Sequence, residues 1–490
     1  MSPLLLGTVA STYKNPIEYW FEVPVTRGPV LNVNHTYTNA GNLCYSNISS
    51  SSNSYVTGRY VQQDIYGNNN KVWAIPLSWS GISAQAPVTA TDPNNGSFYV
   101  YNRVAQSAQP CRLVKYDVNG SYQWGLDFYG AVGIALNKIV FDSSSNLYVS
   151  WNYVNSQSDN GTYLTKLNPA NGAIIWQRKI ISTVFAQWCI TLDMELNPYN
   201  NRLYLGIQSN TAGGVSGIAV YDLSGNLIYM KDLPTTMTYQ NISGTIYRQP
   251  KITSIGFDSS GNVYVVNALS GGSFSRSTIN FVFKLDSSFN IVWTRQFANI
   301  TGSDTDGSFV NGLTDANGNT YIWSYMTTTG SQVYILCINA SGTLTYTRGF
   351  TVASSTTQYV ISSNIGVVNF TGAPSTGAWT YYYYNTGFCL DPIVPFSMFF
   401  SIYVGISTTN TYILGRLNVD GTTLGTYTAG TETFQYTAPT FPTAFTSPTG
   451  LSMLSTASFA DSAGALGAGT ATSAINLSIT TLPVGKTSVA

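Results

Sequence analysis

Residues 257–266 read Phe-Asp-Ser-Ser-Gly-Asn-Val-Tyr-Val-Val, and residues 284–293 read Lys-Leu-Asp-Ser-Ser-Phe-Asn-Ile-Val-Trp. Variants of these two phrases alternate along most of the chain. Each phrase is an apolar stretch, then Asp or Asn with Ser, Gly and Asn, then an apolar stretch ending in an aromatic residue. Gly and Asn tolerate positive φ, and Asp and Asn bond to their own backbone, so each phrase predicts a tight hairpin. Two hairpins per unit predict four antiparallel strands.

The aromatic residue that closes the second phrase marks the length of the repeat. These closing residues are Trp73, Trp124, Trp176, Tyr229, Trp293 and Tyr346, which lie 51, 52, 53, 64 and 53 residues apart. A four-stranded unit of about 40 to 50 residues, repeated in this way, is typical of a β-propeller blade. With a degenerate unit at 358–430, we predict an all-β propeller of about seven four-stranded blades.

Two other β architectures are alternatives to the propeller. A series of β-sandwiches would need about 100 residues for each domain. The coils of a β-solenoid are usually shorter than this repeat. Both alternatives fit the spacing less well.

The repeats divide the chain into three segments. Residues 1–30 are expected to form an N-terminal arm, or a strand that closes the ring by completing the last blade, and residues 31–430 to form the propeller. The 64-residue step leaves room for an insertion at 235–250. Residues 431–490 are an extended low-complexity tail, mainly of Ala, Gly, Ser and Thr, which we expect to become ordered only against a partner.

Composition limits the possible partners and location. Lys and Arg number 21, Asp and Glu number 21, and charged residues make up only 9% of the chain. This balance argues against nucleic-acid binding. The start of the chain lacks a basic n-region, so synthesis in the cytoplasm without a signal peptide is expected. The apolar run at 393–406 is interrupted by Pro395 and is too short to insert into a membrane.

Residues suited to catalysis are scarce. His35 is the one histidine, and the five cysteines are scattered without the spacing of a zinc site. Most carboxylates occupy hairpin turns; the acids that stand out away from the turns are Asp159, Asp193, Glu195, Asp304, Asp306 and Asp391. Residues 302–307 resemble the start of a calcium loop, but the bidentate Glu is missing. We therefore predict a protein that is not an enzyme, with no catalytic residues, cofactor or metal.

Aromatic side chains are the remaining candidates for a binding site. Five tryptophans lie outside the closing position and are candidate glycan-stacking residues: Trp79, Trp151, Trp188, Trp323 and Trp379. The alternative is that they pack between blades, where propellers keep large side chains.

The repeats also resemble a known group of proteins. Residues 163–180 (Tyr-Leu-Thr-Lys-Leu-Asn-Pro-Ala-Asn-Gly-Ala-Ile-Ile-Trp-Gln-Arg-Lys-Ile) and residues 257–266 resemble bacterial β-propeller repeats, over about 37–350. Similar repeats with a Thr/Ser/Ala-rich tail look like those of structural proteins of tailed marine bacteriophages. The resemblance implies a virion protein, a tail or capsid-surface propeller anchored by its termini. Its partners would be other virion structural proteins, in multiple copies per particle.

Two further functions remain open at this point. One is a carbohydrate-binding propeller that recognises host-surface glycans, on the same particle or elsewhere. The other is a quinoprotein-like or polysaccharide-degrading enzyme. The strand sequences resemble pyrroloquinoline-quinone dehydrogenase propellers, but the acid and metal ligands of those enzymes have no counterpart, so this resemblance supports the fold alone.

Overall fold

The computed structural model describes most of the repeats and parts of both terminal segments. The described residues are 20–25, 30–31, 36–51, 54–64, 71–75, 87–102, 105–106, 111–128, 133–154, 161–183, 189–209, 215–234, 238–240, 246–248, 251–268, 279–299, 308–326, 332–352, 364–370, 379–385, 388–390, 397–406, 409–418, 424–429, 432–438, 443–446, 459–463, 470–471 and 485–487. No described residue belongs to a helix that is long and apolar enough to cross a membrane.

The turn chemistry predicted from the phrases is present. In the turn after Phe257, Asp258 Oδ1 accepts hydrogen bonds from the backbone N–H groups of Ser260 (3.0 Å) and Asn262 (3.0 Å). Gly261 has a φ of +78°, a left-handed conformation that suits glycine. Asp222 makes the same bonds to Ser224 (2.9 Å) and Asn226 (2.8 Å). Each phrase therefore folds locally into a hairpin.

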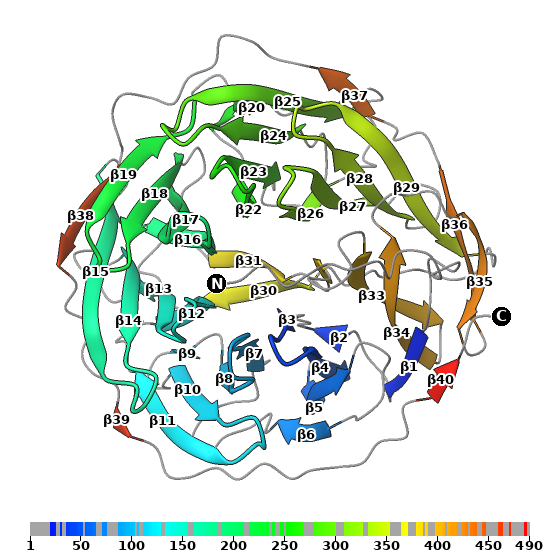
Figure 1. Cartoon of the computed structure of the whole chain (residues 1–490), viewed down its shortest axis with the longest axis horizontal. Coiled ribbons are helices and arrows are strands. Elements are labelled where there is room, and N and C mark those ends of the chain that lie inside the picture. Colours follow the sequence, from blue (N-terminus) through cyan, green and yellow to red (C-terminus); the bar gives the residue numbers. More distant parts are fainter. Residues whose placement is uncertain are drawn as a thin grey trace, which may run out of the picture.

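The hairpins assemble into seven antiparallel sheets of four or more strands, arranged as a ring of blades (Figure 1). Blade 1 contains β2 (Val30–Leu31), β4 (Asn42–Ser51), β5 (Ser54–Asp64) and β6 (Lys71–Ile75), with β3 (Thr36–Tyr37) paired to β4. Blade 2 contains β7 (Pro87–Thr91), β8 (Phe98–Asn102), β10 (Cys111–Tyr116) and β11 (Tyr122–Phe128). Blade 3 contains β12 (Gly133–Phe141), β13 (Leu147–Val154), β14 (Gly161–Leu167) and β15 (Ile174–Ser182), with β9 (Ala105–Gln106) paired to β12.

The remaining blades follow around the ring. Blade 4 contains β16 (Cys189–Asn197), β17 (Arg202–Ser209), β18 (Ser216–Asp222) and β19 (Leu227–Asp232). Blade 5 contains β22 (Lys251–Phe257), β23 (Val263–Ala268), β24 (Ile279–Leu285) and β25 (Ile291–Asn299). Blade 6 contains β26 (Ser308–Thr314), β27 (Thr320–Met326), β28 (Gln332–Ile338) and β29 (Leu344–Val352). Blade 7 contains β32 (Phe388–Leu390), β33 (Ser397–Ile406), β34 (Thr409–Asn418) and β1 (Trp20–Val25). The predicted all-β propeller is confirmed.

Two further hairpins interrupt the repeat. β20 (Thr238–Gln240) and β21 (Ile246–Arg248) lie within the long step between Tyr229 and Trp293. β30 (Asn364–Phe370) and β31 (Trp379–Asn385) lie across the middle of the ring, where β30 contacts β2 and β31 contacts β26 (Figure 1). The seventh sheet thus uses less of 358–430 than the degenerate unit suggested, because part of that segment forms the central hairpin.

The hydrophobic core lies between blades. One buried cluster combines Tyr99 and Trp124 of blade 2 with Leu136 and Trp151 of blade 3, and similar clusters join blades 1 to 2, 3 to 4, 4 to 5 and 5 to 6. Since both faces of such a blade are covered by neighbours, its strands can be apolar on both faces.

A closing tryptophan joins one blade to the next at four of the junctions. Trp73, Trp124, Trp176 and Trp293 each donate their indole N–H to a backbone carbonyl in the following blade's outer turn: Asn119 O (3.3 Å), Pro169 O (3.0 Å), Leu223 O (3.2 Å) and Ala340 O (3.0 Å). A glycine with positive φ lies against each ring: Gly120, Gly172, Gly225 and Gly342. The same contact therefore recurs at four junctions.

The junction between blades 4 and 5 uses a different pair. The closing residue is Tyr229, and Phe289 occupies the turn position where the other blades have glycine. The two rings stack with centroids 4.0 Å apart, although Phe289 has a φ of 66°. Phe289 fills the volume that a tryptophan fills elsewhere.

We predict that Tyr229 and Phe289 are energetically coupled. Tyr229→Trp alone overfills the junction, and Phe289→Gly alone leaves a gap, whereas the double variant restores the pair found at the other junctions. The double variant should therefore be more stable than the sum of the single effects by about 1 to 2 kcal/mol. Denaturant unfolding of all three variants measures this coupling, and additive effects would contradict it.

Strands from both terminal segments, β1 and one strand near the C-terminus, are built into the ring. β1 pairs with β34 along Trp20 to Val25, so this strand from the N-terminal segment completes the last blade. On its other edge β1 pairs with β40 (Gly485–Thr487). This arrangement removes an exposed edge where the ring closes.

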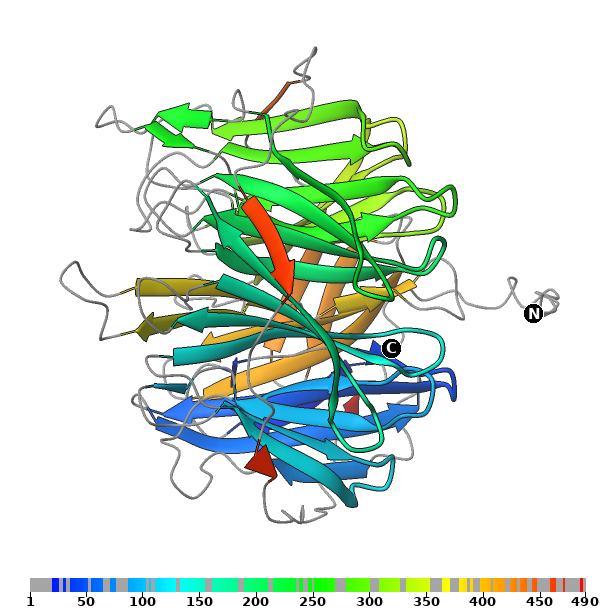
Figure 2. The same ribbon diagram turned by 90° about the vertical axis from the view of Figure 1, so that its left-hand side faces the viewer.

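The described strands of the C-terminal segment lie on the outer edges of the blades. β36 (Glu432–Thr437) pairs with β29, β37 (Thr443–Thr446) with β25, β38 (Phe459–Ala463) with β15, β39 (Thr470–Ala471) with β11, and β40 with β1. β35 (Gly425–Ala429) adds a further strand beside β36. We call β36 to β40 the C-terminal belt; Figure 2 shows β38 on the rim. The partner of these tail strands is this chain's own propeller.

Candidate functional site

Charged side chains from two blades meet at the inner ends of blades 3 and 4. Lys138 Nζ of β12 donates to Asp193 Oδ1 of β16 (2.6 Å) and also to Glu195 Oε1. Asp193 Oδ2 accepts the backbone N–H of Ile255 in blade 5 (3.0 Å). One ionic cluster therefore links three successive blades.

The electrostatics of this cluster favour a charged lysine. Burial opposes the charge of Lys138, but Asp193 and Glu195 outweigh it and raise the pKa of Lys138 above its ordinary value. Burial also raises the pKa of Glu195, against the attraction of Lys138. The side chains of Lys138 and Glu195 remain 35% and 36% exposed, and that of Asp193 is 8% exposed. The arrangement is that of an ion pair that joins blades.

Backbone bulges position these side chains. The register of the innermost strand shifts in four successive blades, between Leu136 and Lys138, Thr191 and Asp193, Ile252 and Ser254, and Phe309 and Asn311. Side chains at these bulges bond to the next blade: Asn137 Nδ2 donates to Thr191 O (2.7 Å), and Ser254 Oγ donates to Gly312 O (2.6 Å). Bulges redirect side chains, and here they direct them to a neighbouring blade.

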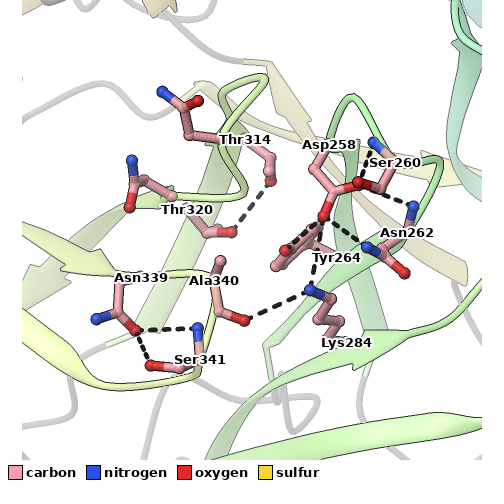
Figure 3. Close-up of polar contacts among 12 residues, drawn as sticks. Asp258, Ser260, Asn262, Tyr264, Lys284, Thr314, Thr320, Asn339, Ala340 and Ser341 are labelled. Atoms are coloured by element: carbon pink, nitrogen blue, oxygen red, sulfur yellow. Dashed lines mark hydrogen bonds and ion pairs between the residues drawn. The ribbon is translucent and has the colours of Figure 1, made fainter.

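Turn carboxylates form a second set of polar clusters, shown for Asp258 in Figure 3. Asp258 Oδ2 accepts hydrogen bonds from Asn262 Nδ2 (2.8 Å) and Tyr264 Oη (2.9 Å), and Lys284 Nζ lies 3.6 Å away. Lys284 also donates to Ala340 O of blade 6 (3.5 Å). Burial opposes the charge of Asp258, but these donors together lower its pKa. Each oxygen of this carboxylate has structural partners.

The same cluster recurs in two other blades. Tyr148 donates its hydroxyl to Asp142 Oδ2 (3.0 Å), and Tyr321 donates to Asp315 Oδ2 (3.0 Å). Burial, together with the nearby carboxylate, raises the pKa of each tyrosine. In the first phrase, the Asp, Asn and Tyr of the pattern Asp-x-x-x-Asn-x-Tyr therefore bond to one another and stabilise the turn. The fixed position of the tyrosine in the phrase was the sequence signal for this contact.

Of the five candidate tryptophans, the structure describes the side chains of Trp151 and Trp323. Trp151 is fully buried, with its ring 4.4 Å from that of Phe128, and Trp323 is 5% exposed. Their burial fits packing inside the ring, the alternative to glycan stacking. Trp379 begins β31, and its side chain is not described; Trp79 and Trp188 lie outside the described residues.

Other candidate residues are placed as follows. His35, Asp159, Asp304, Asp306 and Asp391 lie outside the described residues. Cys44, Cys111, Cys189 and Cys337 are buried cysteines, and burial raises the pKa of the first three to about 12. Among the residues that the structure describes, no three His, Cys, Asp or Glu side chains gather as metal ligands. Lys138, the cation that bonds to Asp193 and Glu195, was not among the candidate residues predicted from the sequence.

No protein-family model matches the sequence, and no curated protein sequence matches it. Several solved structures are similar in fold at low identity. The β-propeller domain of the Trilobed protease from Pyrococcus furiosus is 8% identical over 65% of this chain and 95% of that chain, with a TM-score of 0.34. A PL25 ulvan lyase is 7% identical over 83% and 96%, with a TM-score of 0.48, and the quinohemoprotein alcohol dehydrogenase from Comamonas testosteroni is 12% identical over 81% and 76%, with a TM-score of 0.36. The propeller assignment rests on the sheet topology above.

Proposed function

We propose that this protein is a non-enzymatic structural or adhesion component of a phage or virus particle. In this role a rigid propeller is carried on the tail or capsid surface, in multiple copies, and contacts other virion structural proteins. The resemblance of the repeats to structural proteins of tailed marine phages suggests the role. The low charge and the Ala/Gly/Ser/Thr-rich tail are consistent with it.

The belt is the observation that carries this proposal furthest. It adds strands to five blades, and β40 joins the strand that completes the last blade. The described carboxylates at the turns and inner bulges bond to groups that hold turns and blades together. These polar groups of the repeats thus stabilise the propeller, and a component of a particle requires a stable fold.

The test is the composition of purified particles. Mass spectrometry of particles from the virus that encodes this chain should detect it at a constant ratio to the major structural proteins. Retention of the chain through repeated density-gradient purification is the expected result. Its loss into the soluble lysate, with intact particles lacking it, would overturn the proposal.

A glycan-binding role on the same particle is favoured by one observation. The central hairpin has the sequence Trp-Thr-Tyr-Tyr-Tyr-Tyr at 379–384, and sugar rings bind by stacking on aromatic side chains. If the hairpin binds host glycans, Trp379→Ala should abolish the signal of the full chain on a glycan array. A blank array for the unaltered chain would exclude this second role for the glycans printed on it.

A further inference from the structure

The rim of the propeller offers a repeated set of acceptor edges for an added strand. β38 pairs with residues Arg178 to Ser182, which lie two to six positions after Trp176. β37 pairs with Gln296 to Asn299, three to six positions after Trp293, and β36 pairs with Gly349 to Val352 at the same offsets from Tyr346. Because the blades are repeats, the acceptor edges are near copies of one another.

The belt strands have features that specify their register weakly. They are short, with two to five paired residues on each of β11, β15, β25 and β29. Residues 431–490 contain three charged residues, Glu432, Asp461 and Lys486. Strands of small or uncharged residues without a strong apolar face are prone to alternative pairing and to domain swapping.

We propose that these rim edges form an interface between copies of this chain, in which the belt of one copy pairs with the outer strands of its neighbour. A strand added to the outside of a finished blade has no topological need to belong to the same chain. The pairs made within one chain and those made between chains are identical, as in other domain-swapped assemblies. The proposal deepens the particle role proposed above, because it names how the copies are joined.

Local concentration decides whether the belt pairs with its own propeller or with that of a neighbouring copy. In an isolated chain the tether holds the belt near its own rim at an effective concentration in the millimolar range, about 1 mM. Copies held side by side present neighbouring rims at comparable concentrations, so exchange then costs little. Belt exchange would join neighbouring propellers through the same strand pairs that a single copy makes within itself.

Residues 181 and 460 provide the test, since Ile181 lies opposite Ala460 in the β15–β38 pair. In the full chain, Ile181→Cys with Ala460→Cys should give an intrachain product with a short thiol-to-thiol crosslinker. Chains carrying only Ile181→Cys are then co-expressed with chains carrying only Ala460→Cys, and the purified mixture is concentrated to about 1 mM, where neighbouring rims compete with the tethered one. We expect a covalent chain dimer that contains both labelled peptides. The matched control replaces Ile181→Cys with Tyr199→Cys, an exposed position (47%) away from the belt, and should give no dimer.

Each outcome decides a separate point. An intrachain product without any dimer from the co-expressed chains would overturn belt exchange and leave the belt within one chain. Failure of the double-cysteine chain to crosslink would also overturn it, because the acceptor register would be wrong. The crosslink needs no virus, so the absence of the chain from purified particles would count against the proposed function alone.

Discussion

Replacing Gly120 with alanine is expected to destabilise the protein by about 3 kcal/mol. A Cβ at this position would lie 2.0 Å from Trp73 Nε1 and 2.5 Å from Trp73 Cδ1. Trp73 is 1% exposed and packs against Tyr60 and Phe98, so its ring has little room to move. Thermal or denaturant unfolding of the purified variant measures the effect.

Gly261→Ala is the matched control for this prediction. Gly261 has a φ of +78°, almost the same as the +79° of Gly120, but nothing lies within 4 Å of its Cβ position. Both variants share the cost of a left-handed alanine, about 1 kcal/mol. The remainder, about 2 kcal/mol, comes from the clash with Trp73. Equal destabilisation by the two substitutions would show that the closing tryptophan does not lock blade 1 to blade 2.

The sequence predicted the parts of the fold that are local. Asp258, Gly261 and Tyr264 occupy fixed positions in one phrase, so the turn and its strands follow from a few residues. The partner of Trp73 could not be predicted, because Asn119 belongs to the next repeat and the two meet only when blades pack face to face. The position of the closing aromatic was visible, but its contact was not.

The belt shows a different limit of prediction. Residues 459–463, Phe-Ala-Asp-Ser-Ala, have no strong strand pattern of their own. They form β38 because β15 presents an unpaired backbone edge, and pairing with such an edge is a property of the rim rather than of the tail. Low-complexity composition therefore indicated an extended segment but not where it would bind.

The sequence indicated the two acids of the ionic cluster formed by Lys138, Asp193 and Glu195, but not its lysine. Asp193 and Glu195 stood out as acids away from the turns, whereas Lys138 looked like an ordinary strand residue. Lys138 precedes Asp193 by 55 positions, about one repeat, which places both at the same height on adjacent blades. Opposite charges separated by one repeat length were the available signal, and the bulge at residue 137 hid it by shifting the alternation of β12.

Lys138→Met is expected to destabilise the protein by about 2 kcal/mol at neutral pH. The substitution leaves Asp193 and Glu195 as two adjacent carboxylates without their shared cation. The expected cost is below that of a fully buried pair, because the Lys138 side chain is 35% exposed and solvent screens part of the interaction. Lys71→Met, which removes an exposed lysine of β6, is the control and should change stability by less than about 0.5 kcal/mol.

The pH dependence separates this ionic role from simple packing. In the unaltered protein the pKa of Lys138 is raised, so its contribution is present at neutral pH and is lost only as the pH rises above 10.5, the ordinary value. In Lys138→Met, Glu195 loses the attraction of Lys138, so its pKa, which burial already raises, should rise further. Lowering the pH from 7 to 5 should therefore reduce the difference in unfolding free energy between the variant and the unaltered protein. Glu195→Gln in the Lys138→Met background should reduce the same difference at pH 7. A gap that stays constant across this range would mean that Lys138 acts through its aliphatic chain rather than through its charge.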